Sequence, residues 1–273
     1  MLRMKDRNGW WLITHPDHAR LAGEFAAVWG NVEFCAPEPR ERVLYGIRSH
    51  DDGWAERDRH PSVTREGKPS AFSSELVGKY SAFEEIDLAE YLAVRERAVW
   101  LIGERDAYAG LLVALHTYNL LTERADRSTI KTTLLPLLDS FLEKQRAYQA
   151  ELRERIAGDA TLSDEECGEA AIDGHFRLLQ ACDNLSLLSC VAYDKPAHLL
   201  HPLRLNNGGA VAVKVEPVGV REFRLEPWPF AARELRFTFP ARFVDGEVFA
   251  DSAALEAAYL GALVVRLDVR LVP

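Results

Sequence analysis

The sequence has few cysteines and no long apolar run. Its 273 residues include four cysteines, and none of them stands in a Cys-x-x-Cys arrangement. Cys182 and Cys190 lie in a strongly apolar stretch that predicts a helix, which favours reduced, buried thiols over a disulfide framework. No stretch approaches about 18 consecutive apolar residues, so we expect no membrane span.

An excess of basic residues is also missing. Lysine and arginine number 33 against 42 aspartates and glutamates, a formal net charge of -9. A sequence-independent nucleic-acid surface needs a basic footprint and is therefore excluded. A phosphorylated small molecule is still compatible with this charge, because a bound metal supplies local positive charge. Asp6 and Arg7 stand where a signal peptide needs apolar residues, so we expect a cytoplasmic location.

Two common catalytic signatures are absent from the sequence. Gly208-Gly209 leads into a predicted strand, without the G-x-G-x-x-G spacing or the following helix of a dinucleotide site. There is no G-x-S-x-G nucleophile elbow. What the chain does have is an ordinary globular balance of 48% hydrophobic and 27% charged residues, enough for one large domain or two small ones.

Apolar periodicity predicts helices before Pro196 and strands after it. Asn8-Gly9 is a strong turn signal, so residues 1–14 should form a β-hairpin. The predicted helices cover 14–30, 39–53, 83–103, 106–124, 130–157 and 170–193, and the predicted strands cover 210–216, 221–226, 234–240 and 262–272. We therefore expect a mainly α fold. A helical domain over 1–195 would be followed by a small antiparallel β subdomain over 196–273, joined by the N-terminal hairpin.

Polar residues interrupt the apolar faces of four predicted helices. His18, for example, shares a stripe with Leu21 and Phe25, at spacings of three and seven. The polar sites are His18, the adjacent pair His50-Asp51, His116 and Asp183. A single histidine on such a face is more often a hydrogen-bonded core residue than a ligand, and the pair could simply cap its helix. Three inward histidines with two inward acids favour a metal site over packing.

Asp183 is the most informative of these residues. Its neighbourhood, LLQACDNLSLLSCVAY, is apolar on nearly every side, and Arg177, the nearest cation, falls on a different helix face. A buried carboxylate costs several kcal/mol unless it is paired or binds a metal. Imidazole with carboxylate suits Fe, Mn, Co, Ni or Zn, so we expect one or two divalent transition metal ions.

The remaining histidines are weaker candidates. His175 precedes Asp183 by eight residues and could point into the same cavity. His198 and His201 are followed by Pro202 and have no acid beside them, which favours a loop. His15 fits the helix entry, and His60 lies in a charged stretch where a solvated side chain is expected.

The order His18, His50-Asp51, Asp183 on helices resembles the HD superfamily of metal-dependent phosphohydrolases. The resemblance covers residues 15 to about 193 and implies a helical bundle. It implies that these four residues hold a first metal, that Asp51 is both ligand and catalytic residue and bridges to a second metal, and that His116 supports that second ion. A metal in such a site activates a water and polarises a phosphoryl oxygen. The pair is followed here by Asp52-Gly53-Trp54, where the hydrolases more usually continue Ile-Gly.

Whole phrases of the sequence are similar to an uncharacterised bacterial family, catalogued as domain of unknown function thirty-eight ninety-one. The phrases are Asp17-His18-Ala19, His50-Asp51-Asp52-Gly53-Trp54 and the segment from Leu179 to Leu187. The family has no assigned activity, so this similarity supports the site without naming a substrate.

The function predicted from the sequence is hydrolysis of a phosphorylated small molecule or a nucleotide by metal-activated water. Arg48 and Arg57 flank the histidine-aspartate pair and are candidates for binding substrate phosphates. Trp54 and Tyr118 are candidates for the apolar or stacking walls of the site. Two alternatives stay open: an HD-type di-iron oxygenase, and a non-catalytic sensing or interaction module in which the metal is structural. The sequence does not specify an oligomeric state.

Overall fold

Helices follow a short N-terminal β-hairpin and make up most of the first two thirds of the chain. The structure is a computed structural model that describes residues 1–77 and 87–273. Its α-helices are α1 (His15–Ala27), α2 (Arg40–Ser49), α3 (Leu88–Arg105), α4 (Ala107–Asn119), α5 (Leu135–Ala157), α6 (Asp164–Cys167), α7 (Glu169–Cys190) and α8 (Ser252–Gly261). Short 3-10 turns lie at η1 (Asp52–Trp54), η2 (Arg57–Arg59), η3 (Ser74–Leu76), η5 (Arg127–Thr129) and η6 (Thr132–Leu134), and a π-helical turn, η4 (Leu120–Arg124), extends α4.

The strands come from both ends of the chain. They are β1 (Leu2–Asp6), β2 (Gly9–Ile13), β3 (Ala197–His198), β4 (Leu203–Arg204), β5 (Ala210–Val211), β6 (Lys214–Gly219), β7 (Glu222–Glu226), β8 (Leu235–Asp245) and β9 (Val264–Val272). Seven of them form one sheet in the order β1-β2-β8-β9-β7-β6-β3, and β4 pairs with β5 separately. β2 pairs antiparallel with β8, so the N-terminal hairpin is part of the large sheet. β7 pairs with β9 in parallel, which makes the sheet mixed.

The prediction of a mainly α, HD-like bundle with a small antiparallel β subdomain is wrong. The seven-stranded sheet is a major, curled element of the fold, and it is not purely antiparallel. The physical reason is that alternation of apolar and polar residues marks a strand and its buried face but not its neighbour. The insertion of β9 between β8 and β7 depends on contacts that only the folded chain makes.

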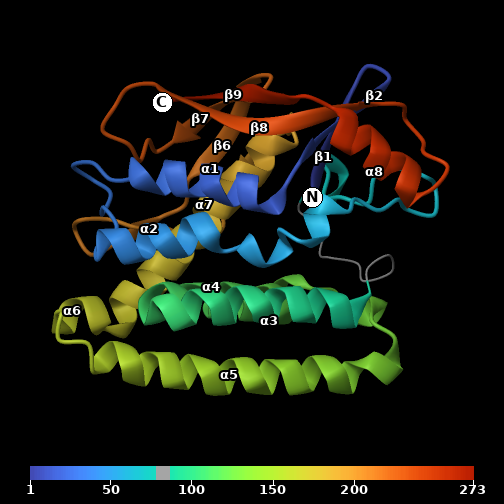
Figure 1. The fold of residues 1–273 in the computed structure, drawn as a ribbon. Helices are drawn as coiled ribbons and strands as arrows, with labels where there is room; N and C mark the ends of the chain where they lie inside the picture. Colours follow the sequence, from blue (N-terminus) through green and yellow to red (C-terminus); the bar gives the residue numbers. More distant parts are fainter. Residues whose placement is uncertain (78–86) are drawn as a thin grey trace.

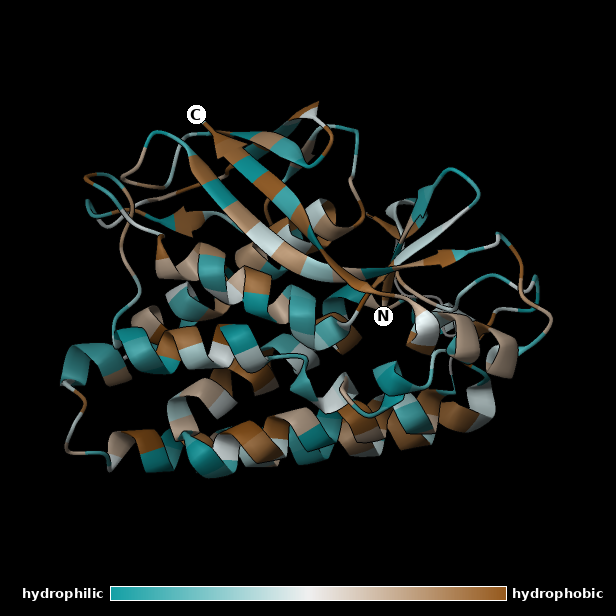
Figure 2. Cartoon of the chain, turned by 45° about the horizontal axis from the view of Figure 1, so that its top comes forward, coloured by the Kyte–Doolittle hydropathy of each residue, from teal (hydrophilic) through white to brown (hydrophobic). Residues whose placement is uncertain are grey.

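The elements are stacked in layers (Figure 1). The sheet covers α1 and the upper part of α7, α2 lies below α1, and α3 and α4 separate α2 from α5, the helix farthest from the sheet. One apolar cluster runs through sheet and helices alike, since it contains Phe25 and Leu179 as well as Phe239 and Leu271. The long strands β8 and β9 alternate hydrophobic with hydrophilic residues, as expected for a sheet with one face on helices (Figure 2).

Most predicted elements have counterparts in the structure. The predicted helix 83–103 corresponds to α3, although its first four residues lie outside the described residues. The helix α8 was not predicted, although Asp251 caps it by accepting a hydrogen bond from the Ala254 N–H. Whether 1–195 and 196–273 are separate domains stays a prediction. In the described part of the chain, none of the helices combines the length and apolar character needed to cross a membrane.

Candidate metal centre

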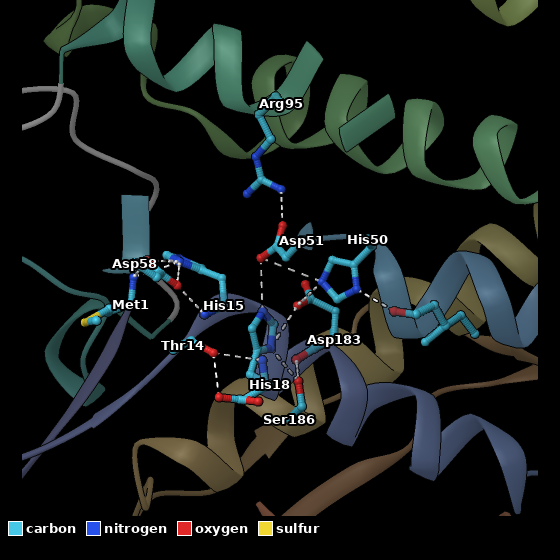
Figure 3. A network of polar contacts seen from close by, with 12 residues as sticks. Met1, Thr14, His15, His18, His50, Asp51, Asp58, Arg95, Asp183 and Ser186 are labelled. Carbon is cyan, nitrogen blue, oxygen red and sulfur yellow. Dashed lines mark hydrogen bonds and ion pairs between the residues drawn. The ribbon is translucent and has the colours of Figure 1, made fainter. Parts of the chain in front are cut away.

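The structure brings the five predicted ligands close together. Figure 3 shows four of them, His18, His50, Asp51 and Asp183, pointing toward one another. Potential ligand atoms of His18, His50 and Asp51 lie within 4.8 Å of one another, and so do those of His50, His116 and Asp183. All five residues are buried, with exposed fractions between 1% and 7%. Buried histidine and aspartate groups that could hold a metal ion are therefore present.

The first turn of α1 positions His18. Thr14 caps the helix by accepting a hydrogen bond from the Asp17 N–H at 3.1 Å, and Pro16 fits the first turn. His18 then falls on the same face as Leu21 and the fully buried side chain of Phe25. The apolar stripe thus carries the imidazole inward.

The end of α2 positions His50 and Asp51. α2 ends at Ser49, His50 is its C-cap, and Asp51 begins the 3-10 turn η1. The Nδ1 atom of His50 lies 2.7 Å from the carbonyl oxygen of Ile47, which can only accept, so Nδ1 carries the proton. Because the backbone turns here, the two adjacent side chains converge on one point.

The Nε2 atom of His50 is a buried polar atom without a hydrogen bond. It lies 3.2 Å from Asp183 Oδ1 and 3.9 Å from Asp51 Oδ2, but neither contact has hydrogen-bond alignment. Burial alone lowers the pKa of His50, yet Asp51 and Asp183 outweigh it and raise the pKa to about 9. The negative charges of Asp51 and Asp183 therefore favour a cation at Nε2 of His50, either a proton or a metal ion.

His18 is held in the same tautomer. Ser186 donates its hydroxyl hydrogen to the Asp183 carbonyl oxygen at 2.8 Å, so its oxygen accepts from Nδ1 of His18, also at 2.8 Å. A neutral His18 consequently presents the lone pair of Nε2 to Asp51 Oδ2 at 3.0 Å. Two imidazoles with Nδ1 hydrogen-bonded and Nε2 facing carboxylates match the usual arrangement of metal-binding histidines and their supporting partners. The residues present fit a divalent transition metal.

His116 closes the centre on the α4 side. Its ring lies edge-on to that of His50, with centroids 5.1 Å apart. Burial lowers the pKa of His116 to about 3, so the ring is neutral and able to bind a metal. Its Nδ1 is 3.4 Å from the side-chain nitrogen of Gln180, whose oxygen lies 2.9 Å from His201 Nε2. Gln180 contacts His116 from α7, and its amide nitrogen donates to Nδ1, whereas Ser186 accepts from Nδ1 of His18.

Arg95 is a site residue that was not predicted from the sequence. It enters from α3 and donates a hydrogen bond to Asp51 Oδ1. Its guanidinium carbon lies 5.4 Å from the Trp54 ring centroid and 5.3 Å from that of Tyr91. Arg95 is only 7% exposed, so it is a buried counter-charge to Asp51. Its signal was its place on the apolar stripe of α3, four residues after Tyr91 and three before Ala98.

A family model described as "Protein of unknown function (DUF3891)" matches residues 1–246. The chain belongs to this family. The comparisons found no matching curated protein and no matching solved structure. The match covers all five candidate ligands and Arg95 but not α8 and β9. It does not extend to the HD superfamily, so that resemblance rests on the order and placement of the histidines and aspartates.

The predicted substrate-binding residues of the DUF3891 chain fall into two groups. Trp54 lies beside the centre, stacked on His15 with ring centroids 4.4 Å apart, and the Arg57 guanidinium carbon is 5.5 Å from the Trp54 ring centroid. Arg48 is exposed, with its guanidinium over the Tyr45 ring. The half-buried ring of Tyr118 is covered by Arg146. The described contacts thus bring only Trp54 and Arg57 to the side of the centre that holds Arg95.

The other histidines serve elsewhere in the DUF3891 chain. The buried Asp58 carboxylate lies 3.0 Å from His15 Nδ1, and burial lowers the pKa of His15 to about 4. His60 is an exposed partner of Glu256. His175 does not join the centre: its Nδ1 lies 2.8 Å from the Tyr108 hydroxyl, and it lines a separate cavity of about 510 Å³. None of the five candidate ligands lines that cavity.

Proposed function

We propose that this protein is a metal-dependent hydrolase of a phosphorylated small molecule or a nucleotide. The observation that carries the proposal is the arrangement of His18 and His50. Each directs a buried Nε2 atom at a buried carboxylate while Nδ1 is hydrogen-bonded elsewhere. The chemistry of this donor set suits a divalent transition metal, of which Fe, Mn, Co, Ni and Zn are the candidates.

In this proposal His18, His50, Asp51 and Asp183 hold the metal, and His116 is placed to support a second ion. A bound divalent ion supplies an activated water and polarises a phosphoryl oxygen. Ser186 acts as a positioning residue, because its hydroxyl oxygen accepts a hydrogen bond from Nδ1 of His18. Arg57 and Trp54 are proposed to contact the substrate at the side where Arg95 stands, while Arg48 and Tyr118 remain predictions.

The charges around the centre support an anionic substrate. Asp51 and Asp183 carry two negative charges and Arg95 one positive charge, so a divalent ion brings the group to a net positive charge. A water-excluded positive site attracts a phosphoryl group more strongly than the same charges would in water. Thiol nucleophiles are disfavoured on α7, since burial raises the pKa of both Cys182 and Cys190.

The test combines metal analysis with a substrate screen. Purified protein is analysed for bound metal, then reconstituted with Mn, Fe, Co, Ni, Zn or Mg and assayed for phosphate release from phosphomonoesters, phosphodiesters and nucleotides. Asp51→Asn should lower turnover by at least about 100-fold, because losing a ligand should exceed the 10–100-fold cost of losing an outer partner. Asp52→Asn, at the adjacent exposed acid, is the matched control.

Other results would point to other functions. Stoichiometric metal without turnover of any phosphoester would contradict the hydrolase and favour a structural metal in a sensing or interaction module. Iron content with oxygen-dependent turnover would favour the di-iron oxygenase. Protein that binds none of these metals would remove the basis of all three functions.

A further inference from the structure

Arg95 is held by aromatic rings as well as by its ion pair. Its guanidinium lies over the rings of Trp54 and Tyr91, and Nε donates to the Tyr91 hydroxyl oxygen at 3.3 Å. Trp54 is itself fixed by stacking on His15 and by an edge contact with Tyr91. These contacts orient the guanidinium plane by packing, so its place does not depend on Asp51 alone.

Beside Arg95, some hydrogen-bond donors of the centre have no acceptor among the described residues. Arg95 uses one terminal amino group on Asp51 and Nε on Tyr91, and its other amino group makes no hydrogen bond within 1–77 and 87–273. The Trp54 indole nitrogen is buried without a partner, although Trp54 is only 3% exposed. Buried donors without acceptors are rare, because each costs about 1–3 kcal/mol. A buried, unpaired indole N–H beside a guanidinium with one uncommitted amino group indicates an acceptor that residues 1–77 and 87–273 do not supply.

A metal ion bound by Asp51 would weaken the ion pair between Asp51 and Arg95. Asp51 faces His18 with one oxygen and Arg95 with the other. A divalent ion held by Asp51 would take over the compensation of its charge. The guanidinium would then have donors for a second anion, in a fork geometry that fits two oxygens of a tetrahedral oxyanion.

We infer that Arg95, together with the indole N–H of Trp54, forms an oxyanion subsite for a phosphoryl group, and that metal binding at Asp51 opens it. Arg57, over the same indole, adds positive charge at this side. The inference rests on the proposed metal centre and adds the residue that selects the substrate. It requires a coupling: metal strengthens oxyanion binding, and by linkage the oxyanion strengthens metal binding by the same factor.

The coupling is tested with inorganic phosphate as the probe. Isothermal titration calorimetry measures phosphate binding to full-length protein that is either chelator-treated or loaded with one equivalent of Mn²⁺ and dialysed. Wild-type protein should bind phosphate at least tenfold more tightly when loaded, on the order of a moderate allosteric coupling. In the converse titration, phosphate should raise the affinity for Mn²⁺ by the same factor. Equal phosphate affinity with and without metal, or no phosphate binding, would overturn the inference.

Variants of α3 assign the effect to Arg95. Arg95→Gln should abolish the gain in phosphate affinity, whereas Arg97→Gln, at an exposed arginine paired with Glu56 two residues away, should retain it. Arg95→Lys keeps the charge beside Asp51 if the Gln variant fails to fold. It should bind Mn²⁺ stoichiometrically but phosphate about tenfold more weakly, because the forked donor geometry is lost. Wild-type phosphate affinity in loaded Arg95→Lys would show that Arg95 is only a structural counter-ion.

These measurements separate the inference from the proposed function. Phosphate binding that needs metal and Arg95, without hydrolysis of any phosphoester, would keep the subsite and reject the hydrolase. Phosphoester hydrolysis whose KM is unchanged in Arg95→Lys would keep the hydrolase and reject the subsite.

Discussion

At the scale of single residues, a proton and a divalent ion compete for one atom, Nε2 of His50. The carboxylates that would complete a metal site are the same groups that raise the pKa of His50 to about 9. The competition makes the pH dependence of metal binding a direct probe of the centre.

Metal affinity should rise with pH up to about 9. Below that pH His50 carries a proton that must leave when the metal binds, so affinity should increase about tenfold per pH unit between pH 6.5 and 8.5. Chelator competition at several pH values measures the slope, and calorimetry in buffers of different ionisation enthalpy measures the proton released. His60→Gln, at an exposed histidine, is the control. A flat profile would show that His50 Nε2 is not a ligand.

The sequence was more informative about ligands than about the residue that neutralises them. His18, His116 and Asp183 stand out because each is a single polar residue on an apolar helical face. Arg95 was missed because it is followed by Glu96 and Arg97, and a run of charges on a helix is usually a solvated face. Its place on the apolar stripe of α3 indicates the buried face, but the approach of the η1 turn, which completes the burial, is not encoded within α3.

At the scale of elements, the contact between η1 and α3 sets the distance from Asp51 to Arg95. A Cβ atom added to Gly53 would lie 2.4 Å from the Val94 carbonyl oxygen and 2.9 Å from the Ala98 Cβ. Only glycine allows the turn to approach the helix backbone this closely. The contact also accounts for the glycine in Asp52-Gly53-Trp54, the position at which the Ile-Gly of the hydrolase pattern has glycine too.

Replacing Gly53 should lower both the stability of the protein and its affinity for metal, although Gly53 is not a candidate ligand. In Gly53→Ala the added methyl group would push η1 away from α3, costing about 1–3 kcal/mol of stability, and would displace Asp51, at the start of η1, from the other candidate ligands. We expect a lower melting temperature by calorimetry and an Mn²⁺ affinity reduced by about tenfold. Gly261→Ala, where a Cβ would meet nothing within 4 Å, should leave both unchanged. An unaltered metal affinity in Gly53→Ala would show that this contact does not position the centre.

Helices were predicted better than the sheet, for a physical reason. The apolar period of a helix is local, so α1, α2, α4 and α7 can be recognised within one segment. A sheet is defined by pairs of segments, and its strands here are as distant in sequence as β2 and β8. Their pairing is selected by packing in the whole molecule, as is the parallel contact of β7 with β9.

At the scale of the whole molecule, sheet and helices share one apolar cluster. Phe223, Phe239 and Leu271 from the strands belong to the same cluster as Phe25 and Leu179 from the helices. The cluster therefore bears on whether residues 1–195 can fold without the rest of the chain.

A fragment of residues 1–195 should fail to fold cooperatively. Removing 196–273 would expose the side of α1 that packs on β8 and leave β2 paired with β1 alone. We expect thermal unfolding followed by circular dichroism to show a broad, non-cooperative change and no Mn²⁺ binding, while the full chain treated identically shows one sharp transition. A cooperative transition with metal binding in the fragment would establish two independent domains.

The central place of β9 in the sheet has a consequence for biosynthesis. Within residues 1–77 and 87–273, the partial sheets β1-β2-β8 and β7-β6-β3 are hydrogen-bonded to each other only through β9. After β8 has been synthesised, residues 246–272 take on the order of 1–5 s to be translated. During that interval β7 and β8 lack the neighbour that covers their edges, and an open edge can pair with another nascent copy. The yield of native protein should therefore respond to translation speed over this short segment.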